Sequence, residues 1–206
     1  MTQRALIIVD LQNDYFPGGK WTLTGIEAAA ANAARLLQSA RAAGHLVVHV
    51  RHESPKSDAA FFVAGSEGAA IAPQVINKEG EHVVLKHQIN AFRDTDLKNI
   101  LDRNDIEEVV IAGAMSHMCV DAITRASVDF GFKATVIHDA VATLDMEFGG
   151  VKVPAAHVHA AFMAALGFGY ATLQSTGRCC KSRRCRRAFT RDPKFMKYAR
   201  TAGVQV

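Results

Sequence analysis

The sequence predicts an α/β protein, a three-layer α/β/α sandwich whose central sheet is mainly parallel and doubly wound. Two observations support this prediction. Short apolar runs rich in β-branched residues alternate along the chain with longer segments that have helical spacing. The apolar runs are also continuous rather than interrupted at every second position, and strands of this kind need helices on both faces of their sheet.

The first half of the chain contains three runs of this type and one long helical segment. The predicted strands are 6–9, 46–50 and 83–85. Residues 26–43 are rich in alanine and are predicted to form a helix, which Gly44 ends with a left-handed cap. Segment 53–80 contains several glycines and prolines, which predicts a long connection with one short helix at the rim of a pocket.

The second half of the chain continues the same alternation. The predicted strands are 109–111, 134–137 and the weaker run 170–173. The predicted helices are 96–103, 120–130 and 155–166. Gly131 follows the second of these helices as a cap, and Pro154 can open the third at its first turn. No internal repeat interrupts this order, so one domain is expected.

Composition limits the class of protein. A chain of 206 residues with 49% hydrophobic composition can bury one sizeable core. Its apolar runs stay far below the ~20 residues of a membrane span, and residues 1–4 lead straight into a strand rather than into a signal-peptide core. We therefore expect a soluble, cytoplasmic protein. Only Cys119 lies in the patterned region, which does not predict a disulfide scaffold.

Charge is distributed unevenly. Residues 178–206 contain ten Lys or Arg and one acid, a net charge of +9, whereas the whole chain carries +4. Residues 1–177 are therefore mildly acidic at −5. The basic character of the chain is confined to its last segment and indicates nothing about what the rest binds.

Three apolar runs end on a reactive or charged side chain. Asp10 follows the first run, Lys86 ends the third, and Cys119 lies between the fourth run and the helix after it. In open parallel sheets, ligands bind beyond the carboxyl ends of the strands, so these side chains are expected to meet there. A helix N-terminus favours thiolate over thiol, which predicts a reactive cysteine with a lowered pKa.

Three motifs carry a resemblance to a known family. They are Ile-Val-Asp-Leu-Gln-Asn-Asp-Tyr-Phe at 8–16, Lys-His-Gln-Ile-Asn-Ala-Phe at 86–92 and Gly-Ala-Met-Ser-His-Met-Cys-Val-Asp at 113–121. With this order and spacing, the chain from about residue 4 to 175 resembles the isochorismatase-like cysteine hydrolases. The resemblance implies a Rossmann-like, isochorismatase-like hydrolase fold. It also implies a homodimer or a homotetramer that acts on a small-molecule substrate.

By the same resemblance, Asp10, Lys86 and Cys119 occupy the positions of the family's catalytic triad. Cys119 would attack a carbonyl carbon, Asp10 would carry the proton, and Lys86 would orient the pair. The Ala114–Met115 bond falls where the family has a cis peptide. The backbone N–H groups of Met115 and Cys119 would then form an oxyanion hole. The implied reaction is cofactor-independent hydrolysis of a small amide or related acyl bond through a thioester.

Six residues near the motifs are candidate substrate contacts, each with an ordinary structural alternative. His117 can contact substrate or cap the helix, and Gln12 can hydrogen bond the triad or the chain turn. The aromatic residues can line an apolar pocket or belong to the core. The candidates are Gln12, Phe16, Trp21, Phe92, His117 and Phe148.

No metal site is predicted. Nicotinamidases of this superfamily carry an Asp-x-His pair and a further His near the second strand, where this chain has His-Val-Arg-His-Glu at 49–53. The Asp is missing, so His49 and His52 are expected to shape a pocket wall rather than bind zinc.

The sequence after residue 175 lies outside the family pattern. We expect a hydrolase domain over 1–175 and a basic, Cys- and Arg-rich extension over 176–206 that contains Cys179, Cys180 and Cys185. Three origins are open for it: a cloning or frame-shifted extension, a disordered tail that contacts nucleic acid or anionic surfaces, and a rim that packs on a neighbouring subunit.

Two other functions are left open by the sequence. The first is an isochorismatase-type vinyl ether hydrolase, in which Asp10 would be the essential acid and Cys119 dispensable. The second is a binding module without catalysis, in which the basic tail contacts nucleic acid.

Overall fold

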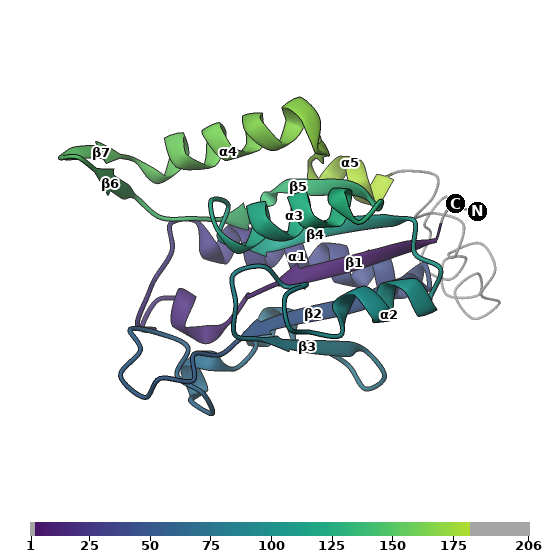
Figure 1. Ribbon diagram of the computed structural model, residues 1–206, viewed down its shortest axis with the longest axis horizontal. Coiled ribbons are helices and arrows are strands. Elements are labelled where there is room, and N and C mark those ends of the chain that lie inside the picture. Colours follow the sequence, from purple (N-terminus) through teal and green to yellow (C-terminus); the bar gives the residue numbers. More distant parts are fainter. Residues whose placement is uncertain (1–2, 182–206) are drawn as a thin grey trace, which may run out of the picture.

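A computed structural model describes residues 3–181 as a six-stranded parallel sheet between two layers of helices (Figure 1). The strand order is β3-β2-β1-β4-β5-β8, so the chain winds outward in both directions from the β1/β4 pair. The strands are β1 (Arg4–Val9), β2 (Leu46–His52), β3 (His82–Lys86), β4 (Glu108–Ala114), β5 (Lys133–Ala142) and β8 (Ala171–Gln174). The predicted α/β sandwich with a doubly wound sheet is confirmed.

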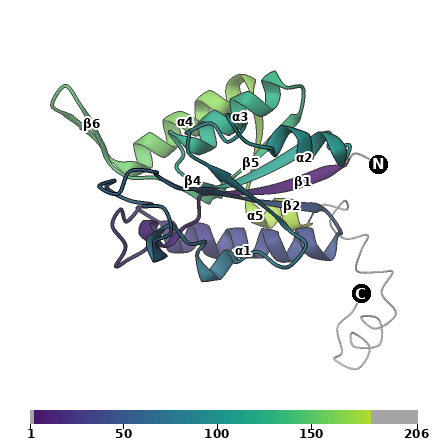
Figure 2. The ribbon, with the colours of Figure 1, turned by 60° about the horizontal axis from the view of Figure 1, so that its bottom comes forward.

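The helices divide between the two faces of the sheet (Figure 2). They are α1 (Ile26–Ala42), α2 (Leu97–Arg103), α3 (Cys119–Asp129), α4 (Ala155–Gly169) and α5 (Thr176–Lys181). Helices α1 and α5 cover one face, and α2, α3 and α4 cover the other. Successive residues of β1 serve both cores, since Leu6 and Ile8 face α1 while Ile7 faces α2 and α3. This explains why its sequence is apolar without alternation.

Two short elements were not predicted. A hairpin of β6 (Met146–Phe148) and β7 (Val151–Val153) projects from the end of β5, with Gly149 and Gly150 at positive φ in its turn. Its strands are too short to give a detectable period. Helix α5 lacks an apolar period but begins where Asp139 accepts hydrogen bonds from Thr176 N and Thr176 Oγ1, at 2.7 and 2.8 Å.

Segment 53–80 differs from its prediction. It contains two 3₁₀ turns, Glu67–Ala69 and Pro73–Val75, in place of one short helix. Ser66 caps the first turn by accepting from Ala69 N at 3.2 Å, and Pro73 opens the second. Each turn therefore has its own start signal, which limits it to three residues.

The last described residues pack on the domain. Helix α5 contacts α1, and Cys179 is buried in the core between them. Residues 176–181 thus form part of the folded structure, while the predicted basic extension beyond them, including Cys185, lies outside the described residues. No helix within 3–181 is long and apolar enough to cross a membrane. The expected homodimer or homotetramer stays a prediction.

An ion-pair cluster joins α1 to the start of β3. Arg41 donates from Nε and Nη2 to the two carboxylate oxygens of Glu81, at 2.6 and 2.8 Å. Lys78 N donates to Glu81 at 2.8 Å, and His49 Nε2 lies 3.2 Å from the same carboxylate. The hydrogen bonds from Arg41 lower the pKa of Glu81 from its usual 4.5 to about 2, although burial opposes this shift.

This cluster predicts acid lability. Because the pKa of Glu81 is lower in the folded state, its contribution to stability is complete above about pH 4.5 and is lost as the pH falls towards 2. After allowance for solvent screening, we expect about 1–2 kcal/mol at pH 7. Urea unfolding of wild type and Glu81→Gln between pH 2 and pH 7 measures it. The two stability curves should converge at low pH, and parallel curves would contradict the assignment.

Candidate active site

Asp10, Lys86 and Cys119 meet at the carboxyl edge of the sheet, which lies away from the N-terminus in Figure 1. Asp10 follows β1 with φ 50°, and its N–H donates to Val50 O at 3.0 Å. Lys86 is the last residue of β3, and Cys119 is the first residue of α3. Asp10 and Lys86 are fully buried, and Cys119 is 6% exposed. The long side chain of Lys86 spans the width of β2 to reach the other two.

Lys86 is the centre of the cluster. Its Nζ lies 2.9 Å from Asp10 Oδ2 and 3.2 Å from Cys119 Sγ. It also lies 2.9 Å from His52 Nδ1 and 3.1 Å from Gln88 O. An ammonium group has three protons and no acceptor, so four acceptors compete for three hydrogen bonds. One of the four acceptors is therefore without a full hydrogen bond at any time, and it can take one over from another acceptor when the charges around Nζ change.

Burial and charge set the protonation states of the cluster. Burial alone would lower the pKa of Lys86, but the negative charge of Asp10 opposes it and the pKa is raised, with Cys119 adding to this effect only when its thiol is ionised. Burial also raises the pKa of Cys119, the charge of Asp10 adds to this, and Lys86 only partly opposes it. The expectation of a lowered thiol pKa is therefore wrong. The resting site holds an ammonium beside a neutral thiol.

Asp10 is positioned to accept the thiol proton. Besides the Lys86 ammonium and the Cys119 thiol, no group in the described part of the chain donates a hydrogen bond to its carboxylate. A buried carboxylate with so few donors retains accepting capacity for a proton. Asp10 can thus accept a proton from the adjacent Cys119 thiol.

His52 is a member of the cluster that sequence reasoning did not assign to it. Since the Lys86 ammonium can only donate, His52 Nδ1 must be the unprotonated nitrogen of a neutral ring. Burial lowers the pKa of His52, and the charge of Lys86 lowers it further. Its place at the end of β2, between β1 and β3, was the available signal. Within residues 3–181, no three His, Cys, Asp or Glu side chains form a group that could hold a metal ion.

A tight loop joins β4 to Cys119. The peptide bond between Ala114 and Met115 is cis. Ser116 N donates to Ala142 O at 3.0 Å, while Met118 N and Val120 N donate to Met115 O at 3.0 and 3.2 Å. The Met115 and Cys119 N–H groups are not among these donors. They lie at the start and at the end of the loop.

Gln12 binds the backbone rather than the cluster. Its Nε2 donates to His52 O and to Ala69 O, both at 2.7 Å, and its Oε1 accepts from His52 N at 2.8 Å. These bonds tie the ends of β1 and β2 to the 3₁₀ turn at 67–69 and use both N–H groups of the fully buried amide. Gln12 thereby fixes the backbone beside Asp10.

An aromatic cluster lies next to the triad residues. Tyr15 is buried, and its ring centroid lies 4.5 Å from that of Phe62 and 5.7 Å from that of Phe61. Burial and then the charges of Asp10 and Cys119 raise the pKa of Tyr15, which places it near both. The rings of Trp21 and Phe61 are tilted to each other with centroids 5.1 Å apart, and the ring centroid of Phe62 lies 6.1 Å from that of His52. Sequence analysis missed Tyr15, Phe61 and Phe62.

The other candidate substrate contacts have different surroundings. Phe16 packs against the core on the α1 side. Phe92 is buried on the opposite face, with ring centroids 5.0 Å from Phe130 and 6.4 Å from Phe132. Phe148 is 89% exposed on the projecting hairpin. In the described chain, Phe92 and Phe148 are therefore not part of the Lys86 cluster.

His117 precedes the nucleophile by two residues. Its Nδ1 lies 2.7 Å from Thr143 Oγ1, and its ring centroid lies 6.0 Å from that of Phe162. Burial lowers the pKa of His117, so the ring is neutral near pH 7. The contact with Thr143 holds the loop to the end of β5.

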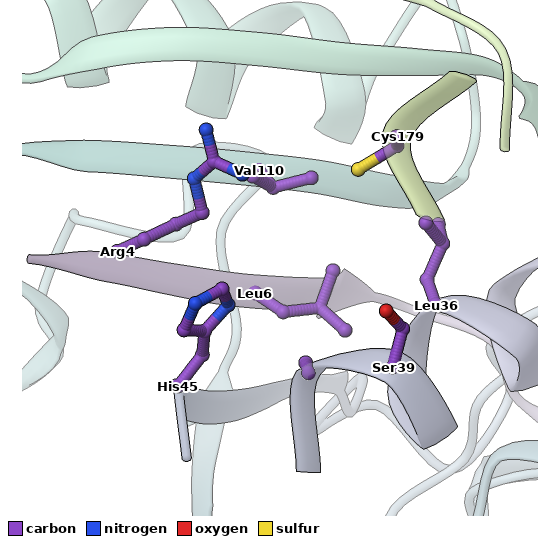
Figure 3. A pocket seen from close by; sticks show the side chains of 8 residues that line it. Arg4, Leu6, Leu36, Ser39, His45, Val110 and Cys179 are labelled. Atoms are coloured by element: carbon purple, nitrogen blue, oxygen red, sulfur yellow. The ribbon is translucent and has the colours of Figure 1, made fainter. Parts of the chain in front are cut away.

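A separate small cavity of about 20 Å³ lies at the amino ends of the strands (Figure 3). Leu6, Leu36 and Val110 form its apolar wall, and Arg4 and Cys179 lie at its border. Arg4 opens β1, so this cavity lies at the amino ends of the strands, and the Lys86 cluster lies at their carboxyl ends.

Comparison with known proteins agrees with the geometry. Residues 4–172 match the family model described as Isochorismatase domain. The chain belongs to the isochorismatase family. It is 46% identical over 172 residues to the uncharacterized isochorismatase family protein YddQ of Bacillus subtilis, covering 84% of this chain and 96% of that protein. Solved structures include a protein from Oleispira antarctica, with 55% identity, a TM-score of 0.85, and coverage of 88% and 97% of the two chains.

Relatives of this isochorismatase-family protein include hydrolases. The maleamate amidohydrolase of Pseudomonas putida is 31% identical over 151 residues, which cover 66% of this chain and 71% of that enzyme. The family to which the chain belongs therefore includes hydrolases, among them an amidohydrolase.

Proposed function

We propose that this protein is a cofactor-independent hydrolase that cleaves a small amide or related acyl C–N bond through a thioester on Cys119. The observation that supports this most directly is the buried Lys86 Nζ, 2.9 Å from Asp10 and 3.2 Å from Cys119. The cluster combines a nucleophile, a base and a fixed positive charge. The relationship to maleamate amidohydrolase supports amide chemistry.

The first half of the reaction acylates the cysteine. Because the Cys119 thiol is neutral at rest, Asp10 removes its proton as the sulfur attacks the substrate carbonyl carbon. One Lys86 N–H turns to the sulfur as negative charge develops there, which the surplus of acceptors around Nζ allows. The Met115 and Cys119 N–H groups receive the oxyanion of the tetrahedral intermediate. Its collapse breaks the C–N bond, and Asp10 returns the proton to the leaving amine.

The second half releases the acid. Asp10, again a carboxylate, takes a proton from a water molecule that attacks the thioester carbon. The tetrahedral intermediate expels the Cys119 sulfur, which regains the proton from Asp10. Lys86 enters the reaction protonated, because the charge of Asp10 raises its pKa against the lowering effect of burial. Its role is to bind and orient rather than to transfer a proton.

The experiment measures ammonia release from a panel of neutral and anionic carboxamides, and detects acylated Cys119 by mass spectrometry of quenched reactions. We expect Cys119→Ala to lower kcat/KM on any active amide by about 10⁴-fold or more and to abolish the adduct. Cys180→Ala removes a thiol in α5 instead and is the matched control. It should leave both kcat/KM and the Cys119 adduct unchanged. Full activity in Cys119→Ala would reject the thioester route.

A further inference from the structure

The loop from Ala114 to Cys119 is attached through Ser116 to helix α4 and to strand β5. Ser116 is fully buried, and its Oγ lies 2.8 Å from His159 Nδ1 on α4. The backbone N–H of the same residue donates to Ala142 O of β5 at 3.0 Å. Ser116 is thus fixed through its main chain to the sheet and through its side chain to a helix of the outer layer.

This double attachment constrains the residue before it. Met115 lies between the end of β4 at Ala114 and the anchored Ser116, so the orientation of its peptide groups depends on both ends. If the side-chain bond is lost, the Ser116 hydroxyl keeps only the long 3.5 Å contact with Ala142 O. A buried hydroxyl with so poor a partner favours rearrangement of the loop.

The contact between Ser116 and His159 persists with a neutral ring. Burial lowers the pKa of His159, and the nearby charge of His138 lowers it further. The histidine can accept from the serine hydroxyl or donate to it, depending on tautomer, and the bond is kept in either case. Its role is therefore geometric.

We propose that His159 is a positioning residue for the oxyanion hole, acting through its hydrogen bond to Ser116. The inference rests on the proposed function, since it assigns the Met115 and Cys119 N–H groups to the oxyanion. His159 itself does not touch the reacting atoms. It fixes the segment that aims these donors, and a displacement of this kind lowers the rate of acyl transfer more than it lowers the reactivity of the thiol.

Two reactions of Cys119 separate these effects. Alkylation by iodoacetamide forms an S–C bond and expels iodide without an oxyanion. Acetylation by 4-nitrophenyl acetate forms a tetrahedral intermediate, which expels 4-nitrophenolate and leaves acetyl-Cys119 for hydrolysis to acetate. Only the second reaction needs the oxyanion hole. Peptide mass spectrometry follows Cys119 apart from the other cysteines.

We expect His159→Ala to lower the acetylation rate of Cys119 by about 10–100-fold while its alkylation rate changes by less than about threefold. His159→Asn places an amide atom near the position of Nδ1 and should recover most of the lost rate. His157→Ala, on the exposed side of the same helix, is the matched control and should change neither rate. In a Ser116→Ala background, His159→Ala should have no further effect.

Equal losses in both reactions would overturn the inference, because they indicate general damage around Cys119. An unchanged acetylation rate in His159→Ala would also overturn the inference. The same holds if His159→Asn acetylates no faster than His159→Ala although its thermal unfolding matches that of wild type. Failure of the proposed function has a different signature. A wild-type protein in which iodoacetamide modifies Cys119 but 4-nitrophenyl acetate never acetylates it would overturn both proposals.

Discussion

Lys86→Met is expected to destabilise the fold by about 3–5 kcal/mol and to abolish hydrolysis, because it removes one partner of a buried ion pair. The Asp10 carboxylate would keep its charge at a position with no exposure while losing the ammonium 2.9 Å away. Methionine has nearly the length of lysine, so little of the effect comes from packing. Urea unfolding at pH 7 gives the stability difference.

The control is a double-mutant cycle. Asp10→Asn in the Lys86→Met protein removes the unpaired charge and should restore much of the lost stability, while activity stays absent. Lys98→Met provides the comparison on the surface. Its ammonium pairs with Asp102 at 2.6 Å in an exposed i, i+4 arrangement, and its loss should cost under about 1 kcal/mol. If Lys86→Met and Lys98→Met lower the free energy of unfolding by the same amount, the buried ion pair is not the cause of the stability loss at Lys86.

Gly113→Ala is expected to destabilise the fold at least as much as Lys86→Met. A Cβ atom on Gly113 would lie 2.0 Å from Val9 O, in the paired strand β1, and the residue has φ 135°. Neither backbone can move aside without breaking the β1/β4 ladder, so we expect a loss above about 4 kcal/mol or failure to fold. The strain would fall beside Asp10 and the loop that carries Met115.

Gly169→Ala is the matched comparison for this prediction. No atom lies within 4 Å of the Cβ position at the end of α4, and Gly169 does not have a positive φ. The substitution should leave stability unchanged or raise it by up to about 1 kcal/mol. Thermal unfolding of the two variants measures the contrast, and a Gly113→Ala protein with wild-type Tm would show that the strands are not in such close contact.

The strand ends were predictable from the sequence, and side-chain directions were not. A charged residue at the end of a continuous apolar run marks the edge of a parallel sheet, which located Asp10 and Lys86. No period in 54–62 indicates that Phe61 and Phe62 fold back onto Tyr15, since that contact depends on the path of a long loop. The same loop geometry decides that Gln12 is occupied by backbone groups.

The thiol pKa illustrates a second limit. The helix N-terminus at Cys119 is visible in the sequence, and it favours the thiolate. How deeply the sulfur is buried, and how near the Asp10 charge lies, depends on strands far apart in the chain. Burial and the charge of Asp10 raise the pKa of Cys119, which is opposite to the effect of the helix N-terminus. The residue type and position were predictable, whereas its protonation state required the packed structure.

The separation of Asp10, Lys86 and Cys119 along the chain also bears on how the protein is made. The ribosome delivers Asp10 first, and Cys119 follows 109 residues later, a delay of roughly 5–20 s at typical elongation rates. Until β4 docks beside β1, the cysteine has neither its base nor its cation. The Asp10–Lys86–Cys119 cluster therefore assembles only after β4 and α3 have been made and have joined β1.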